Sequence, residues 1–247
     1  MPEGAVDGTG GPDGRGLRVA GLQVRYRGGL ALHGIDLDLS PGRRIAVVGR
    51  NGAGKSSLVK AIAGLVPASS GTLLWNGRDV TRWSAAKRVK AGISLVPEGR
   101  QIFPELTVGE NLRVGGFTAG REMASRRGEV LEIFPALSER FDQAASQLSG
   151  GEAQMLAIGQ ALMAKPTLLM FDEPSFGLAP VVINRLLEII RELSERGIAV
   201  LLVEQSVRLA LSLGGDLYVL DGGQLRLAAA AGSEVDPEVL QAAYLGA

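Results

Sequence analysis

The sequence predicts an α/β fold in which a mostly parallel core sheet is flanked by helices, with an antiparallel β subdomain and an inserted helical subdomain. Short buried strands alternate with helical segments through most of the chain, which is typical of a parallel sheet with helices on both faces. Segments of alternating polarity near the N-terminus are typical of antiparallel strands. Residues from about 107 to 147 show helical spacing without a convincing strand. We therefore expect one domain over 17–247, with the helical subdomain at about 100–150.

The expected elements follow one another in a regular order. Residues 17–24 and 35–39 predict the antiparallel strands, and GTLLWNG at 71–77 predicts a strand that ends in an Asn-Gly turn, typical of hairpins. RIAVVG at 44–49 predicts a buried strand that runs through a glycine-rich loop into a helix at about 56–63. Further strands are expected at 93–97, 167–172, 198–204 and 216–221, and further helices at about 152–164, 180–196, 206–213 and 237–245.

The composition limits the partners and the compartment. Among 247 residues, 26 Lys and Arg balance 26 Asp and Glu, so no overall charge attracts nucleic acid or an anionic membrane. The absence of cysteine excludes disulfides and thiolate metal sites. No apolar run approaches the roughly 18 residues that cross a bilayer, and residues 1–16 lack the apolar region of a secretory signal. We expect residues 1–16 to form a disordered Gly-rich tail, and the chain to be cytoplasmic unless something else holds it at a membrane.

GRNGAGKS at 49–56 fits the phosphate-binding pattern G-x-x-x-x-G-K-[ST] between a buried strand and a helix, where that pattern must lie. Glycines let backbone N–H groups surround the phosphates, Lys55 reaches the β and γ groups, and Ser56 offers a hydroxyl to Mg²⁺. The flanking elements disfavour the alternative of a plain strand-to-helix turn. The loop residues expected to bind the nucleotide are Gly49, Asn51, Gly52, Ala53, Gly54, Lys55, Ser56 and Ser57.

LLMFDE at 168–173 supplies the acidic groups that such a loop needs. A buried strand ends in Asp172, which is placed to bind Mg²⁺ directly or through water. The next residue, Glu173, can point at the γ-phosphate as the base for an attacking water. Its pairing with the phosphate loop favours these roles over a simple exposed Asp-Glu pair at a strand end.

QLSGGEAQ at 147–154 predicts a helix start with a capping box, in which the Ser149 and Glu152 side chains bond reciprocally to backbone N–H groups. Gly150 and Gly151 lie in the first turn, where glycine can cost roughly 1 kcal/mol relative to alanine. One interpretation is a well-capped helix that tolerates them near its end. The other is an anion site at the helix N-terminus, although no Lys or Arg stands in 141–164 to fix such a charge.

The order of phosphate loop, LSGGE and LLMFDEP resembles the ATP-binding subunits of ABC transporters, and the resemblance covers about residues 17–247. It implies a P-loop NTPase fold of ABC type that hydrolyses ATP with Mg²⁺. Ser149, Gly150, Gly151 and Glu152 match the family's signature motif, which binds the γ-phosphate of ATP held by the other subunit of a head-to-tail dimer. On this basis the partner's own phosphate loop brings the missing lysine.

The resemblance assigns further residues and reveals departures. Tyr26 falls where an aromatic ring stacks on adenine, with an ordinary strand tyrosine as the alternative. Glu98 falls at the usual Q-loop glutamine, which senses Mg²⁺, water and the membrane partner. Gln205 falls at the switch histidine, and its amide can donate to the γ-phosphate but cannot titrate. Ala179 replaces the D-loop aspartate, which weakens a cross-dimer carboxylate contact there. The single histidine, His33, is expected in a solvated turn.

VPEGR, LSGGE, FDEPSFGLAP, LVEQ and AAYLG together are most like the LivF-type ATPase of branched-chain amino-acid importers. This resemblance implies a peripheral subunit at the cytoplasmic face of the cell membrane, paired with a second ABC ATPase subunit, two transmembrane permeases and, indirectly, an extracytoplasmic solute-binding protein. A permease helix would dock near 98–117, where Ile102, Phe103 and Leu106 are equally candidates for the core.

Two alternatives to this function stay open. Relatives that energise uptake of urea, short amides or other small solutes share much of the pattern, because the ATPase never touches the cargo. The other alternative is a soluble ABC ATPase that acts on nucleic acid or the ribosome. Such proteins usually carry a coiled-coil insert or a second ATPase domain with a basic linker. Neither is present here, so nucleic acid is not an expected partner.

Overall fold

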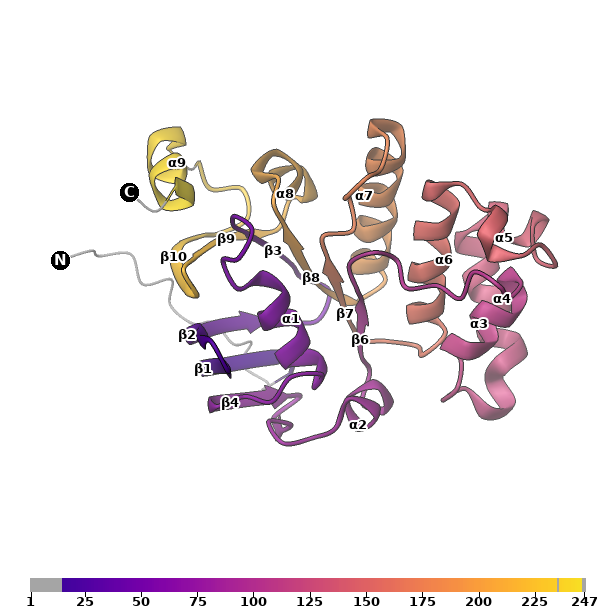
Figure 1. Ribbon diagram of the computed structural model, residues 1–247, viewed down its shortest axis with the longest axis horizontal. Helices are drawn as coiled ribbons and strands as arrows, with labels where there is room; N and C mark the ends of the chain where they lie inside the picture. Colours follow the sequence, from indigo (N-terminus) through magenta and orange to yellow (C-terminus); the bar gives the residue numbers. More distant parts are fainter. Residues whose placement is uncertain (1–14, 235, 246–247) are drawn as a thin grey trace.

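The computed structural model describes residues 15–234 and 236–245, so most of the tail predicted at 1–16 lies outside the described residues. Two sheets form its frame, with strand orders β2-β1-β4-β5 and β10-β9-β3-β8-β7-β6. The strands are β1 Leu17–Tyr26, β2 Gly29–Leu39, β3 Arg44–Val48, β4 Ser70–Trp75, β5 Arg78–Asp79, β6 Ile93–Val96, β7 Leu168–Asp172, β8 Ala199–Glu204, β9 Asp216–Asp221 and β10 Gln224–Ala229. Helix α1 (Lys55–Ala63) lies between the two sheets (Figure 1).

The smaller sheet is antiparallel, as predicted. β1 and β2 form a hairpin in which Tyr26 pairs with Gly29, so β2 begins six residues before the strand predicted at 35–39. His33 is therefore an exposed strand residue paired with Gln23, and the prediction of a turn was wrong. β4 and β5 are joined by Asn76 and Gly77, whose φ angles of 49° and 73° confirm the Asn-Gly hairpin turn.

The larger sheet is mostly parallel, because β3 pairs in parallel with β8 and β9, and β7 with β6 and β8. The strands predicted at 93–97, 167–172, 198–204 and 216–221 are confirmed to within one residue at either end. β10 pairs antiparallel with β9 at the sheet edge and was not predicted. It is short and half-buried, so its alternation of apolar residues is weak.

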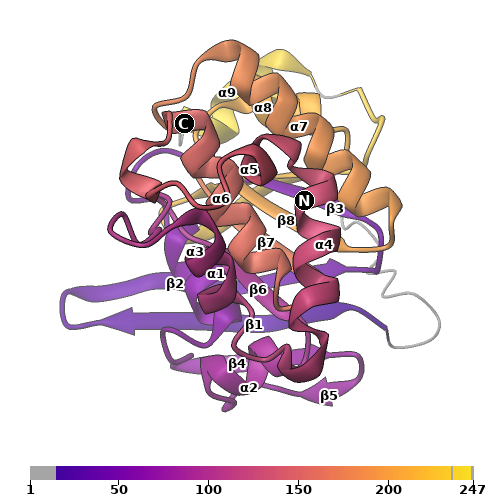
Figure 2. The same ribbon diagram turned by 90° about the vertical axis from the view of Figure 1, so that its right-hand side faces the viewer.

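The helices cover the faces and one end of the core sheet. They are α2 Ala85–Lys90, α3 Val108–Gly115, α4 Met123–Ile133, α5 Pro135–Glu139, α6 Gly150–Leu162, α7 Pro180–Glu195, α8 Val207–Leu213 and α9 Pro237–Leu245, with short 3₁₀ helices at Gly120–Glu122 and Ala145–Gln147. α3, α4 and α5 pack beside α6 as a helical lobe at one end of the molecule, as the end-on view shows (Figure 2). α9 lies at the opposite end (Figure 1). In the described part of the chain, no helix is long and apolar enough to cross a membrane.

The core sheet separates two hydrophobic cores. Because side chains alternate along β7, Leu169 and Phe171 join one core, while Leu168 and Met170 join the other. The first core contains the buried residues of α3, α4, α5, α6 and α7. The second contains those of α1, β1, β2 and β4. The phosphate loop and the helical lobe therefore pack on opposite faces of the sheet.

Arg88 of α2, a helix that was not predicted, is buried at the C-terminal end of α1. Its guanidinium donates to the carbonyl oxygens of Ala61 and Ile62 at 2.6 and 2.7 Å, and to those of Thr81 and Trp83 at 2.9 and 3.2 Å. A cation is favoured at the end of a helix where carbonyl groups have no partner within the helix. Arg88 thus fixes the helix whose other end carries the phosphate loop.

Candidate nucleotide-binding site

The phosphate loop joins β3 to α1 and runs very close to neighbouring backbone. A Cβ at Gly49 would lie 2.3 Å from the carbonyl oxygen of Leu220, and one at Gly54 would lie 2.7 Å from that of Ala31. Gly54 also has a φ of 109° and caps α1 without a side-chain hydrogen bond. The pattern therefore needs glycine at both ends of the loop, and no side chain covers the amides at the start of α1.

Lys55 is buried at the start of α1, with its ammonium turned back over the loop. Its Nζ donates to the carbonyl oxygens of Gly49 and Arg50 at 2.8 and 3.0 Å. The same Nζ lies 3.0 Å from Oε1 of Glu173, whose side chain is also largely buried. The structure thus brings the lysine of the phosphate loop into direct contact with the predicted base.

Asp172 and Ser56 are adjacent, as expected of two ligands of one cation. Ser56 Oγ donates to Asp172 Oδ1 at 3.0 Å, and Asp172 is fully buried at the end of β7. Its other oxygen, Oδ2, has no hydrogen-bond partner among the described residues. Burial raises the pKa of Asp172, and the nearby charges of Glu98 and Glu173 add to the rise. An unpaired buried carboxylate oxygen beside a hydroxyl is a suitable place for a divalent cation.

Glu173 adopts an unusual backbone conformation directly after β7. Its φ is 46°, a region that costs a non-glycine residue about 1–3 kcal/mol. Its amide donates to the carbonyl oxygen of Val203 at 3.0 Å, which ties this turn to β8. The chain thus keeps a strained residue at the point where the carboxylate meets Lys55.

A cavity of about 430 Å³ opens over the loop and gathers most of the predicted residues. Gln205 and Glu98 enter it from the ends of β8 and β6, and Phe176 enters it from the segment after Glu173. Tyr26 does not line the cavity, but its hydroxyl lies 3.3 Å from Ser57 Oγ and its ring is about half exposed. The complete lining is Ala31, Asn51, Gly52, Gly54, Lys55, Ser56, Ser57, Glu98, Glu173, Phe176 and Gln205.

A model of the ABC transporter family matches residues 32–176, which is more than half of the chain. The chain belongs to the ABC transporter family. A high-affinity branched-chain amino acid transport ATP-binding protein from Pseudomonas aeruginosa is 42% identical over 87% of this chain and 93% of that protein. A probable branched-chain amino acid transport ATP-binding protein from Archaeoglobus fulgidus is 35% identical over 93% and 98%, respectively.

The solved structures agree with this assignment. An ATP-binding cassette of an ABC transporter in its ADP conformation has a TM-score of 0.84 and 29% identity, and the match covers 94% of this chain and 99% of that one. The predicted fold class is therefore confirmed. The cavity over the phosphate loop belongs to an ABC-type ATPase.

The signature segment of this ABC cassette begins α6. The capping box is present, because Ser149 Oγ accepts from the Glu152 amide at 3.3 Å and Glu152 Oε2 accepts from the Ser149 amide at 2.8 Å. Because Ser149 caps the helix, α6 begins at Gly150, as the predicted capping box requires and two residues before the approximate range of 152–164. None of residues 149–152 lines the cavity over the phosphate loop. The structure thus does not bring this segment to the chain's own loop.

Both signature glycines have close neighbours within the chain. A Cβ at Gly151 would lie 3.1 Å from the side chain of Val182, and one at Gly150 would lie 3.3 Å from the guanidinium of Arg100. Arg140 pairs with Glu152 at 2.6 Å. Positive charge therefore stands beside this helix start although none lies within 141–164, and Gly151 has a packing role as well.

Glu204 is a buried carboxylate that the sequence analysis missed. Its two oxygens accept from the amides of Ser175 and Gln205 at 3.1 and 3.2 Å. Burial raises the pKa of Glu204, although these hydrogen bonds oppose the rise. The carboxylate thereby joins the loops that follow β7 and β8. A charged residue at the end of the apolar run AVLLVE was the signal that could have found it.

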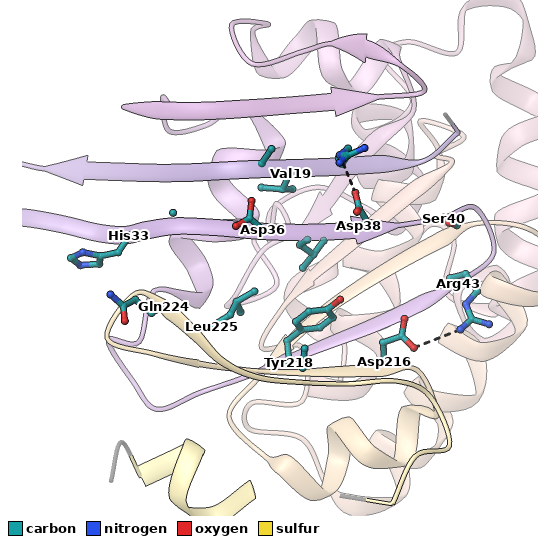
Figure 3. Close-up of a pocket in the computed structure, with 15 residues that line it drawn as sticks. Val19, His33, Asp36, Asp38, Ser40, Arg43, Asp216, Tyr218, Gln224 and Leu225 are labelled. Atoms are coloured by element: carbon teal, nitrogen blue, oxygen red, sulfur yellow. Dashed lines mark ion pairs between the residues drawn. The ribbon is translucent and has the colours of Figure 1, made fainter. Parts of the chain in front are cut away.

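A larger cavity of about 750 Å³ lies between the two sheets, and none of the phosphate-loop residues lines it. Figure 3 shows the residues that do. Asp36, Asp38 and Asp216 line it with Tyr218, whose pKa burial raises. Arg43 pairs with Asp216 at 3.6 Å, and a second arginine, Arg18, pairs with Asp38 at 3.8 Å. The cavity of about 430 Å³, which phosphate-loop residues do line, is therefore the candidate nucleotide site.

Proposed function

We propose that this chain is the ATP-hydrolysing subunit of an ABC importer that energises uptake of branched-chain or related amino acids. Two relatives that match most of the chain are named as branched-chain amino acid transport ATP-binding proteins, which supports the cargo class. The observation that carries the ATPase role is that Lys55, Ser56 and Glu173 line one cavity, with the buried Asp172 hydrogen-bonded to Ser56. A phosphate loop, a hydroxyl beside a buried carboxylate and a second carboxylate are the parts that phosphoryl transfer to water requires.

Lys55 holds the terminal phosphates of ATP in this proposal. An ammonium has three N–H donors, and here its partners are two carbonyl oxygens and Glu173. A phosphate therefore competes with Glu173 for Lys55. Binding of ATP releases the Glu173 carboxylate at the place where the γ-phosphate arrives, so the base is freed when its substrate is present.

Ser56 and Asp172 hold Mg²⁺, which neutralises charge on the phosphates when it is bound. The two side chains fit this cation because a hydroxyl stands 3.0 Å from a carboxylate whose other oxygen is buried and unpaired. Among the described residues no group of three acidic, His or Cys side chains could hold a metal. Mg²⁺ commonly takes few protein ligands together with substrate phosphates.

Glu173 accepts a proton from the attacking water while the oxygen of that water forms a bond to the γ-phosphorus. The bond from that phosphorus to the bridging oxygen breaks, which leaves ADP and inorganic phosphate. Gln205 lines the same cavity, and the NH₂ group of its side chain donates to a phosphate oxygen or to the water. Because an amide does not titrate, Glu173 remains the principal base.

The proposed partners are those of an ABC importer. Ser149, Gly150, Gly151 and Glu152 contact ATP held by a second ABC ATPase subunit, since they lie away from the chain's own cavity. Two permeases hold this pair at the cytoplasmic face of the membrane, and a solute-binding protein delivers the cargo. Near 98–117, Phe103 is about half exposed and suits a permease helix, whereas Ile102 packs against the core and Leu106 is half-buried.

A pull-down tests the proposed function. Tagged Glu173→Gln chain is recovered from its own cells in mild detergent with ATP and Mg²⁺, beside a Lys55→Ala control that lacks the phosphate contact. We expect two permeases with both chains, a larger amount of the second ATPase with Glu173→Gln because bound ATP then links the pair, and binding of leucine by the accompanying solute-binding protein. A binding protein that prefers urea or an amide would show that the importer carries that solute and not a branched-chain amino acid. Nucleic acid or ribosomal proteins in the same fraction would contradict the transport function.

A further inference from the structure

The C-terminal helix α9 packs next to the nucleotide site. Its Leu240, Ala243 and Tyr244 are partly buried against the core that also contains α7 and α8. It rests on β9 and β10, at the end of the molecule opposite the helical lobe (Figure 1). α9 is therefore docked on the sheet that carries the catalytic loops.

Tyr244 connects this helix to Gln205. Its hydroxyl donates to the carbonyl oxygen of Gln205 at 3.1 Å, across 39 residues of sequence. The backbone N–H of Gln205 donates to Glu204 Oε2 at 3.2 Å. Both backbone polar groups of Gln205 are thus held by side chains, while its own side chain faces the nucleotide cavity. A side-chain amide can be aimed only if its backbone is fixed.

A cavity of about 350 Å³ lies between α9 and the catalytic loops. Tyr244 lines this cavity together with Glu204 and Ser206. Glu173, Phe176 and Gln205 line both this cavity and the nucleotide cavity. Tyr244 itself does not line the nucleotide cavity. Its hydroxyl therefore supports Gln205 without lining the nucleotide cavity.

We propose that Tyr244 is a positioning residue that sets the orientation of Gln205 for ATP hydrolysis. This inference rests on the proposed function, in which Gln205 contacts the γ-phosphate or the attacking water. Tyr244 acts only through the Gln205 backbone, so it affects the rate of the chemical step and leaves ATP binding unchanged. The C-terminal helix thereby becomes part of the hydrolytic apparatus.

The first experiment compares Tyr244→Phe with Tyr218→Phe. Tyr244→Phe removes one hydroxyl and keeps the ring that packs on the core, and Tyr218→Phe makes the same change in the cavity between the sheets. Loss of one hydrogen bond predicts a kcat for ATP about three- to tenfold lower in Tyr244→Phe, with KM within about twofold. Tyr218→Phe should keep both values. An unchanged kcat, or an equal loss in the control, would overturn the positioning role.

A double-mutant comparison tests whether the effect passes through Gln205. In a Gln205→Ala background, which itself lowers kcat, adding Tyr244→Phe should cause no further loss because there is no side chain left to aim. The same fold-loss in both backgrounds would show a general structural effect and overturn the proposal.

Amide hydrogen exchange separates this proposal from the proposed function, because it needs no turnover. Tyr244→Phe should speed exchange in residues 205–210, relative to Tyr218→Phe. Unchanged exchange there would overturn the positioning role even in an active ATPase. Faster exchange in a chain that never hydrolyses ATP would contradict the ATPase function and leave the contact between Tyr244 and Gln205 established.

Discussion

Ser56 Oγ donates a hydrogen bond of 3.0 Å to Asp172 Oδ1, across 116 residues of sequence. The bond joins the phosphate loop at the end of β3 to the carboxyl end of β7, although β8 lies between these two strands. It satisfies only one oxygen of a fully buried carboxylate. The structure thus holds a hydroxyl beside a buried carboxylate, and the cost of burying that carboxylate can be measured.

Asp172→Asn should stabilise the chain in the absence of nucleotide. Because burial raises the pKa of Asp172, the folded chain binds its proton more tightly than the unfolded chain does. The free energy of unfolding therefore falls as pH rises above the ordinary value of 3.8. At pH 7 an uncharged amide should be more stable by about 1 kcal/mol, a rise in Tm of about 2–4 °C.

Thermal unfolding at pH 4 and pH 7 checks this expectation. The gain should shrink at pH 4, where the wild-type carboxyl becomes protonated, and an equal gain at both values would exclude the charge as its source. With ATP and Mg²⁺ the order should reverse, because only the wild type gains the full stabilisation of the bound complex.

Lys55→Ala should weaken ATP binding by about 2–5 kcal/mol, since it removes one partner of a buried charge pair and the cation that the phosphates require. Glu173 would also be left in the cavity without its counter-charge. Isothermal calorimetry gives the affinity directly. If circular dichroism shows an intact fold, unchanged affinity would show that ATP does not bind in this cavity.

Glu173→Gln should retain ATP binding while turnover falls by about 10²- to 10⁴-fold, the usual contribution of a general base. Because the amide carries no charge, it competes less strongly with phosphate for Lys55. We therefore also expect a somewhat lower Kd for ATP than in the wild type. Phosphate release and calorimetry on one preparation measure both quantities. Normal turnover would show that another group takes the proton.

Arg88→Met should lower the free energy of unfolding by about 3 kcal/mol, or the Tm by about 6–12 °C, because the Ile62 carbonyl oxygen at the end of α1 loses the Arg88 donor and that of Ala61 keeps only the Gly64 amide. The matched control is Arg82→Met, at an exposed position of the same segment, which should change Tm by no more than about 2 °C. Equal effects of the two substitutions would refute the capping role of Arg88.

The sequence predicted those parts of the fold that have strong local patterns. The parallel strands of the core sheet are largely apolar runs, so their positions were predicted to within a residue. β2 was predicted too short because Gly29 and Gly34 interrupt its pattern. β10 and α2 were missed because each has only six residues and is largely exposed or half-buried.

The same division holds at the site. Lys55, Ser56 and Asp172 belong to motifs with fixed spacing, and the structure brings them together with Glu173. Tyr244 has its contact with Gln205 39 residues away, and Arg88 contacts Ala61 27 residues away. No local pattern encodes such contacts, which depend on how the elements pack.

The separation of the two cores has an evolutionary consequence. The buried side chains of the helical lobe, from Val108 to Met163, pack with the residues on one face of the sheet, whereas the helix that follows the phosphate loop packs with those on the other. Exchange of the lobe for a homologous one by recombination would therefore alter the segment that we propose for permease docking and keep the packing of the phosphate loop intact.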